Sequence, residues 1–387
     1  MDLDLRVFAG GLAASLAAGA LPSVGPAAAA PAYRGPNVIV VRFGGGVRRA
    51  ETIAPKHTYA PYMCNVLAAR GVLVRDMTIA QIKGMPTSHA EGTLNLLTGR
   101  YRAYRKFARH GIVPLYEPTQ PTLFELLHAA FDLAPHEAVL VNGEDRPQEE
   151  FLGQGANKHY GVRYRCEVLS LTRFKLYKLQ RALAEGTLSG TDVEKTRRKL
   201  EELAQHDLRH GAHGQVPALA RFWERWQDRY GSSGLKHPRG DRLLTELALW
   251  ALKDLRPKLM MINYQDPDYV HWGNASHYTR AIGIIDQGLE QLVAAVDADP
   301  AYRDRTVFAI VPDCGRDSNP LMSVPFQHHY NTRSAHEIWA LVFGPGISRG
   351  KVVAKPTDQT SIAPTVGAIM GFKTPVAEGR VLDEISA

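Results

Sequence analysis

Short apolar runs rich in branched residues recur along the chain, and helical patterns separate them. Six segments have this strand character: 37–43, 72–79, 136–143, 258–264, 306–313 and 337–344. Three amphipathic helical patterns lie between the early strands: 59–71, 88–101 and 122–131. Strands that are apolar along their whole length need cover on both faces. The alternation therefore predicts an α/β fold with a doubly wound, mostly parallel sheet flanked by helices.

A helical insert interrupts this alternation. Residues 169–185 and 192–209 have the pattern of two charged helices. We predict a core formed by 33–150 and 257–387, with a basic helical cap at 151–256. The cap holds 20 Lys and Arg against 12 Asp and Glu, and the whole chain has a formal net charge of +7. Such a surface favours an anionic partner, but it lacks a nucleic-acid-binding motif, so we expect no nucleic-acid partner.

The amino terminus has the pattern of a secretory signal. An apolar run from Val7 to Val24 leads into a small-residue segment that ends at Ala32, which predicts a signal peptide over residues 1–32. Asp2 and Asp4 are atypical of such a signal, and an Ala-rich leader is the alternative. We expect an exported protein, periplasmic or secreted, without a transmembrane segment in the mature chain. Three cysteines permit at most one disulfide, and nothing indicates an oligomeric state.

Side chains suited to metal binding follow or precede several predicted strands. The candidates are Asp268, His271, Asp313, Cys314, His328 and His329. Carboxylate, imidazole and thiolate groups together suit zinc or a similar divalent ion. Because the carboxyl ends of neighbouring parallel strands lie at one edge of a sheet, we expect a metal site at that edge. For Cys314, a small buried apolar residue is the alternative interpretation.

A further segment, TSHAEGTLNLLTGRY, brings hydroxyl groups and an imidazole to the start of a predicted helix. Its candidate catalytic residues are His89, Thr87 and Thr93, with Ser88 as another hydroxyl. A helix amino terminus favours anions through its free amides and its dipole. Thr87 and Ser88 are equally typical of helix capping.

The order of these motifs resembles the alkaline phosphatase and sulfatase superfamily, in a type I phosphodiesterase-like pattern. The resemblance covers Asn37–Arg100 and Lys258–Phe372, and its motifs include LLTGRY, a DxxH before a helix, PD-x-GR and HH…EIWALVFGPGI. It implies a doubly wound sheet and a metal-dependent hydrolase of phosphate or sulfate esters. Most phosphatase-like members hold two metal ions, with a Ser, Thr or modified Cys as the nucleophile.

The first metal site implied by the resemblance is present in the sequence. It would consist of Asp268, His271 and His329, with His328 as the alternative to His329. The spacing between Asp268 and His271 is one residue shorter than the commoner pattern. This site supports a divalent cofactor, for which zinc is our prediction.

The second site departs from the family pattern. Gly45 stands where the family carries a metal-binding Asp, and Asp313-Cys314 stands where it carries an Asp-His pair. The family's nucleophile lies nine residues before the position of Thr98, and in this chain that residue is His89. Two explanations remain open. His89, Asp313 and Cys314 could rebuild a second metal site at which activated water attacks the ester. Alternatively, the site is lost and the chain is a catalytically silent binding protein.

Two arginines and three hydroxyl groups complete the set of candidates. Arg48 and Arg316 are candidates for binding an anionic small-molecule ester. A hydroxyl nucleophile at a shifted position, from Thr87, Ser88 or Thr93, is the third mechanism that the sequence allows.

Overall fold

The computed structural model describes residues 30–80, 87–110, 113–143, 150, 155, 157–161, 164–206, 216–231, 240–271, 273–317 and 326–387. Apart from residues 30–32, the predicted signal peptide lies outside this part of the chain. Among the described residues, no helix combines the length and the apolar character needed to cross a bilayer.

A nine-stranded sheet forms the centre of the molecule, with the order β10-β2-β9-β8-β1-β7-β5-β6 and β11 paired to β2. Its strands are β1 (Asn37–Arg42), β2 (Gly71–Thr78), β5 (Ala138–Val141), β6 (Glu167–Leu169), β7 (Leu259–Asn263), β8 (Thr306–Val311), β9 (Glu337–Phe343), β10 (Lys351–Val353) and β11 (Thr357–Asp358). All six predicted strands lie in it. Among the described strands of this sheet, only β9 runs antiparallel to its neighbours. The prediction of a mostly parallel α/β sheet is confirmed.

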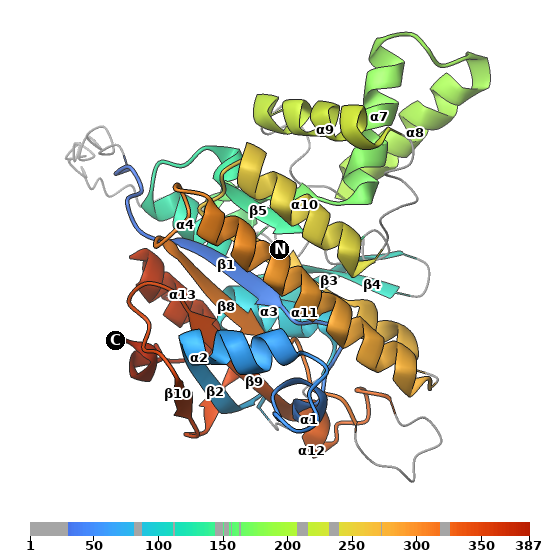
Figure 1. Ribbon diagram of the computed structural model, residues 1–387. Helices are drawn as coiled ribbons and strands as arrows, with labels where there is room; N and C mark the ends of the chain where they lie inside the picture. The colour runs from blue at the N-terminus through green and yellow to red at the C-terminus, as the bar shows by residue number, and fades with distance from the viewer. Residues whose placement is uncertain are drawn as a thin grey trace, which may run out of the picture.

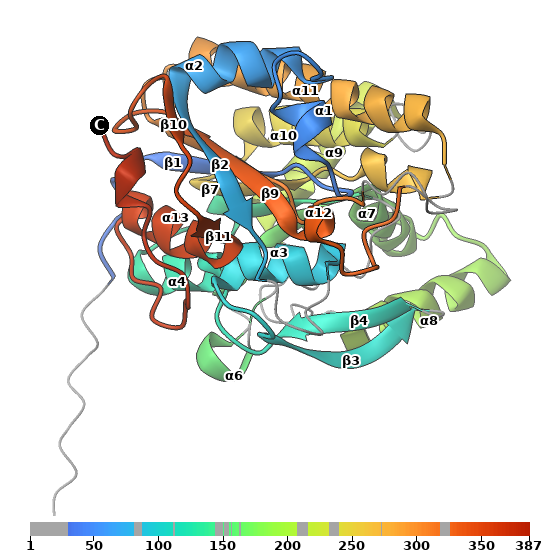
Figure 2. The ribbon, with the colours of Figure 1, turned by 90° about the horizontal axis from the view of Figure 1, so that it is seen from below.

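Helices cover both faces of the sheet, as Figure 2 shows. One face carries α1 (Arg49–Thr52), η1 (Tyr62–Leu67), α2 (Ala68–Arg70), α10 (Asp241–Asp254) and α11 (Ala275–Ala298). The other carries α3 (His89–Thr98), α4 (Leu123–Ala130) and α13 (Ile362–Met370). Side chains alternate between the faces: in β1, Ile39 and Val41 enter one buried cluster and Val38 and Val40 the other. This period of two explains why β1 is apolar at nearly every position.

Several further described elements are short or lie outside the sheet. They are the hairpin β3 (Tyr104–His110) and β4 (Val113–Pro118), η2 (Pro135–Glu137), α6 (Asn157–Tyr160), η6 (Asp266–Val270), α12 (Arg333–His336), η7 (Gln359–Ser361) and η8 (Asp383–Ile385).

The helical excursion from the core is narrower than the predicted cap at 151–256. It consists of α7 (Leu171–Ala184), α8 (Gly190–His206) and α9 (Pro217–Tyr230), which extend away from the sheet in Figure 1. Strand β6 pairs with β5, and α10 packs on α11, so both belong to the core although they fall inside that range. The excursion is joined to the core by aromatic packing, with Trp226 edge-on to Trp250 of α10 at 5.6 Å between ring centroids.

Three neighbouring strands end at the same edge of the sheet. Arg42, the last residue of β1, pairs with Asn263 of β7 and with Val311 of β8. The segments that follow these strands therefore emerge side by side. They are the glycine run 44–46, the segment 264–271 and the segment 312–317.

Candidate metal centre

The first turn of α3 lies against the end of β8. Ser88 is the N-cap, and its Oγ accepts a hydrogen bond from the Glu91 amide at 3.4 Å, which confirms the capping interpretation for this residue. A Cβ at Gly92 would lie 2.3 Å from the Asp313 carbonyl oxygen, so only glycine permits this approach. The close contact directs His89, the first residue of the helix, toward the ends of the strands.

His89 lies between two carboxylates. Its Nδ1 is 2.6 Å from Asp313 Oδ2, and its Nε2 is 2.7 Å from Asp268 Oδ1. All three residues are buried, with Asp313 completely inaccessible and the other two 8% exposed. One imidazole thus joins the segment after β7 to the segment after β8.

Three imidazoles converge on a single oxygen atom, Asp268 Oδ1. The Nε2 atoms of His89 and His271 are each 2.7 Å from it, and His328 Nε2 is 3.3 Å away. These ligand atoms form a group of four within 4.8 Å of one another. Three imidazole nitrogens and one carboxylate oxygen are a donor set typical of zinc sites.

The outer nitrogens of two of these rings determine which tautomer is present. His328 Nδ1 is 2.7 Å from the Thr87 carbonyl, which only accepts hydrogen bonds, so Nδ1 carries the proton. His271 Nδ1 is 2.9 Å from Gln327 Oε1, and the Gln327 amide nitrogen donates to the His271 carbonyl, so Nδ1 is the donor here as well. In the neutral rings both Nε2 lone pairs then face the Asp268 oxygen. A cation between these atoms removes that repulsion, so the residues fit a bound divalent metal.

The charges of His89 and Asp268 shift the pKa values of the residues in this group. Burial opposes protonation of His89, but Asp268 and Asp313 raise its pKa well above the usual value. Burial would raise the pKa of the Asp268 carboxyl, yet the positive charge of His89 holds it far below its usual range. Burial and the charge of His89 lower the pKa of His328 to about 3. His328 is therefore neutral at physiological pH, which is the form that can bind a metal.

The structure selects His328 over His329 as the later histidine of the group. His328 is completely buried, whereas His329 is exposed and belongs to neither of the metal-compatible groups found among the described residues. The His329 ring instead stacks on His271, 5.5 Å between centroids and 6° from parallel. The alternative ligand, His328, is therefore the histidine that lies in the group around Asp268, and the role predicted for His329 stays a prediction.

A second group contains His89, Asp313 and Cys314, the three residues predicted to rebuild the second site. Their ligand atoms also lie within 4.8 Å of one another, and all three residues are buried. Burial, followed by the nearby Asp313 charge, raises the pKa of the Cys314 thiol to about 12. Without a metal, this thiol is therefore protonated and is not a nucleophile.

The candidate hydroxyl groups have structural partners. Thr87 Oγ1 donates to the His328 carbonyl. Thr93 Oγ1 donates to the His89 carbonyl at 2.7 Å and accepts from Arg42 Nη1 at 2.7 Å. Both side chains are buried, with Thr87 3% exposed. These hydrogen bonds position the histidines and do not present a hydroxyl for attack.

Arg316 is placed where it cannot bind a substrate, contrary to our prediction. It is completely buried, and its guanidinium donates to four backbone carbonyls: Gly45, Gly46, Pro267 and Phe326. Its position therefore corrects the predicted role to a structural one, which ties the glycine run to the segment before Asp268.

Arg48 is held by an acid on its own turn. Its Nε donates to Glu51 at 2.9 Å, and Nη2 is 2.9 Å from the other Glu51 oxygen. Its guanidinium also lies over the Phe326 ring at 5.4 Å. This arrangement does not bring Arg48 to the metal-compatible groups, so its predicted substrate contact stays a prediction.

Arg42 is one site residue that sequence reasoning missed, as is Gln327. The position of Arg42 in an apolar strand indicated only β1, yet its guanidinium is fully buried, with Nη1 3.7 Å from Asp313 Oδ2. A charged residue inside an otherwise apolar strand is the one signal that could have found it, because a buried charge requires a partner.

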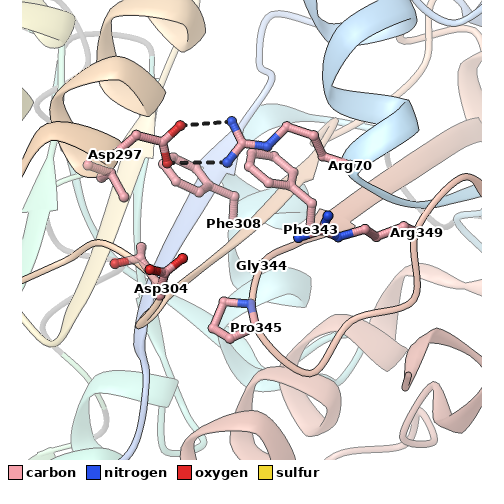
Figure 3. Close-up of a pocket in the computed structure, with 10 residues that line it drawn as sticks. Arg70, Asp297, Asp304, Phe308, Phe343, Gly344, Pro345 and Arg349 are labelled. Carbon is pink, nitrogen blue, oxygen red and sulfur yellow. Dashed lines mark hydrogen bonds and ion pairs between the residues drawn. The ribbon is translucent and has the colours of Figure 1, made fainter.

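A pocket of about 330 Å³ opens at the opposite edge of the sheet (Figure 3). It lies where β8 begins, at Thr306, and is bordered by an ion pair between Arg70 and Asp297 at 3.0 Å. None of the predicted site residues lines it. The pocket is therefore separate from the group around Asp268.

Comparison with known proteins gives structural matches only. No protein-family model matches the sequence, and neither does any curated protein.

Three solved structures illustrate the likeness. Alkaline phosphatase PafA matches with a TM-score of 0.58 at 12% identity, over 92% of this chain and 100% of its own. BT1596, a 2-O GAG sulfatase, matches with a TM-score of 0.53 at 13% identity, over 90% of this chain and 73% of its own. A protein in the alkaline phosphatase superfamily from Vibrio parahaemolyticus matches with a TM-score of 0.51 at 13% identity, over 92% of this chain and 72% of its own. The chain has the fold of the alkaline phosphatase superfamily.

Proposed function

We propose that this protein is an exported, metal-dependent hydrolase of phosphate or sulfate esters, with zinc as its metal. The observation that carries the proposal is the convergence of three imidazole Nε2 atoms on Asp268 Oδ1, at 2.7, 2.7 and 3.3 Å. Two of these rings are held in the tautomer that leaves Nε2 as a lone pair. A buried arrangement of this kind is costly without a cation and favourable with one.

A bound divalent ion would polarise an ester oxygen and lower the pKa of water. The side chains of the site would hold this ion in place. Thr87 and Gln327 orient His328 and His271, so that the lone pairs point toward Asp268. His271 is the most accessible member, with 21% of its side chain exposed against 9% for Asp268. Substrate would therefore approach from the side of His271.

Water is the nucleophile that fits this site best. The position at which the family carries a hydroxyl or a modified Cys is His89, and the hydroxyls of Thr87 and Thr93 have structural partners. The excess of Lys and Arg in the predicted cap, residues 151–256, would favour an anionic substrate.

The altered nucleophile position also favours a second candidate function. A catalytically silent protein on this fold would retain the buried ligands and bind an anionic ester without turnover. Metal binding without hydrolysis of any tested ester would support this function in place of the first.

Metal analysis combined with turnover assays tests the proposal. We expect purified protein to contain a divalent metal and to hydrolyse at least one of an aryl phosphate, a phosphodiester and an aryl sulfate. His271→Ala should lose both the metal and the activity. His277→Ala, an exposed histidine of α11, is the matched control and should retain both. Protein that takes up no metal and turns over no ester would contradict the proposal.

The proposed export depends on the leader over residues 1–32. Expression in a bacterial host followed by fractionation tests it. Mature protein outside the cytoplasm, with an amino terminus near Ala32, would support export, and full-length protein in the cytoplasm would contradict it.

A further inference from the structure

We infer that the site holds one metal ion, bound by His89, His271, His328 and Asp268, and that Asp313 orients His89 without binding a second ion. The inference rests on the proposed function, because it requires that a metal be bound. It concerns how many ions are bound and which residues hold them.

All three imidazoles are anchored in the same way. His271 Nδ1 faces Gln327 Oε1, His328 Nδ1 faces the Thr87 carbonyl, and His89 Nδ1 faces Asp313 Oδ2 at 2.6 Å. In each ring the opposite nitrogen, Nε2, faces Asp268 Oδ1. Histidine ligands of metals typically donate their outer N–H to a carbonyl or a carboxylate. The position of Asp313 is therefore that of such an acceptor.

Both oxygens of the Asp313 carboxylate already accept hydrogen bonds. Its Oδ1 accepts from the Gly46 amide at 3.3 Å and from the Cys314 amide at 2.8 Å. Its Oδ2 accepts from His89, with Arg42 Nη1 at 3.7 Å. A second ion would have to displace the His89 proton and lie beside the guanidinium.

Arg42 occupies this region as a built-in cation. It is completely buried, and it donates to Thr93 Oγ1 at 2.7 Å and to the Tyr264 carbonyl at 3.2 Å. Both contacts hold the guanidinium near Asp313. Two positive groups that share one buried carboxylate repel each other strongly, because little solvent screens them. Arg42 thus already places a positive charge beside Asp313, which disfavours an additional ion at this carboxylate.

The glycine run removes a further ligand. The resemblance to the family implies a metal-binding Asp at the position where this chain has Gly45. Its φ of +83° is one that residues with a side chain rarely adopt, and a Cβ there would lie 2.6 Å from the Asp268 amide nitrogen. A carboxylate cannot enter at this position. Cys314 packs against the neighbouring Gly46, whose Cβ would lie 3.2 Å from the Cys314 sulfur. We therefore assign Cys314 as a small buried residue and not as a ligand.

The number of bound ions and the spectrum of the cobalt-substituted protein test this inference. We expect one metal per chain in the wild type and also in Cys314→Ser. The Co²⁺ protein should lack the intense near-ultraviolet absorption of a thiolate–cobalt bond. Asp313→Asn should still bind one ion, with an affinity for Zn²⁺ lowered about 10- to 100-fold in chelator competition. His89→Ala should weaken binding further, because it removes a ligand.

Two outcomes would overturn the inference. The first is two ions per chain in the wild type that fall to one in Cys314→Ser. The second is a thiolate band in the Co²⁺ protein that disappears in the same variant. An active protein with two ions would contradict the single-ion site and leave the hydrolase proposal standing. A protein that binds no metal and turns over no ester would contradict both.

Discussion

Gly45 lies directly against Asp268. The carbonyl of Gln265 and the amide of Asp268 approach residue 45 so closely that a Cβ would come within 2.9 and 2.6 Å of them. The metal-compatible carboxylate is therefore positioned by backbone that packs on a residue without a side chain. The Gly45 carbonyl also accepts a hydrogen bond from Arg316, which joins this contact to the interior.

Substitution of Gly45 should disturb the metal site as well as the fold. Gly45→Ala combines a strained φ of +83° with contact against the Asp268 amide. We expect a loss of about 2–4 kcal/mol in the free energy of unfolding and weaker metal binding. Gly346→Ala is the matched control, since its φ is +75° and nothing lies within 4 Å of its Cβ. Urea unfolding and metal titration of the two variants measure the difference, and equal effects would contradict this account.

Thr87 should act on the metal through His328. Its hydroxyl donates to the His328 carbonyl, and its own carbonyl accepts from His328 Nδ1. Thr87→Val should lower zinc affinity about tenfold because the loop loses one of these two bonds, whereas Thr87→Ser should retain it. Chelator competition measures both variants. If Thr87 were the nucleophile, Thr87→Val would abolish turnover with its metal affinity unchanged.

Arg316 should contribute to stability. Arg316→Met would leave four backbone carbonyls without their donor, and we expect the free energy of unfolding to fall by about 3 kcal/mol or more. Arg48→Met, which removes a partly exposed ion pair with Glu51, should cost no more than about 1 kcal/mol. Urea denaturation compares them. An unchanged urea midpoint in Arg316→Met, together with a raised KM, would return Arg316 to substrate binding.

The metal-free protein should lose stability at alkaline pH. The pKa of His89 is raised in the folded state, so its contribution is fully present below the unfolded value of about 6.5 and disappears as the pH rises through the folded value. The pKa values of Asp268 and Asp313 are lowered, and their contributions disappear only below about pH 4. In chelator, Tm should therefore decrease from about pH 6.5 upward.

A variant at residue 89 checks this assignment. His89→Gln should remove the alkaline decrease in Tm, while His277→Gln, at an exposed position, should keep it. An alkaline decrease of the same size in His89→Gln would show that another group is responsible.

Periodicity and residue type were sufficient to predict the sheet. The strand at 37–43 was predicted because β-branched residues line both of its faces, and it is β1 between β7 and β8. The burial of apolar side chains repeats with the period of a strand, so the sequence alone indicates it. β6 and α10 were assigned to the cap because they follow an interruption, and only pairing with β5 and packing on α11 identifies them as core.

The sequence by itself determined the α/β class, the edge at which the site lies, and most of the candidate ligands, including Asp268, His271 and His89. Only the tertiary structure decided among neighbours of equal chemistry. It buried His328 and exposed His329, it turned Arg316 inward onto carbonyls, and it placed Arg42 beside Asp313. These choices depend on the direction in which each side chain leaves the backbone and on the charge it meets there. Both the direction and the neighbouring charge are set by packing between segments that are remote in the chain, so no local sequence pattern encodes them.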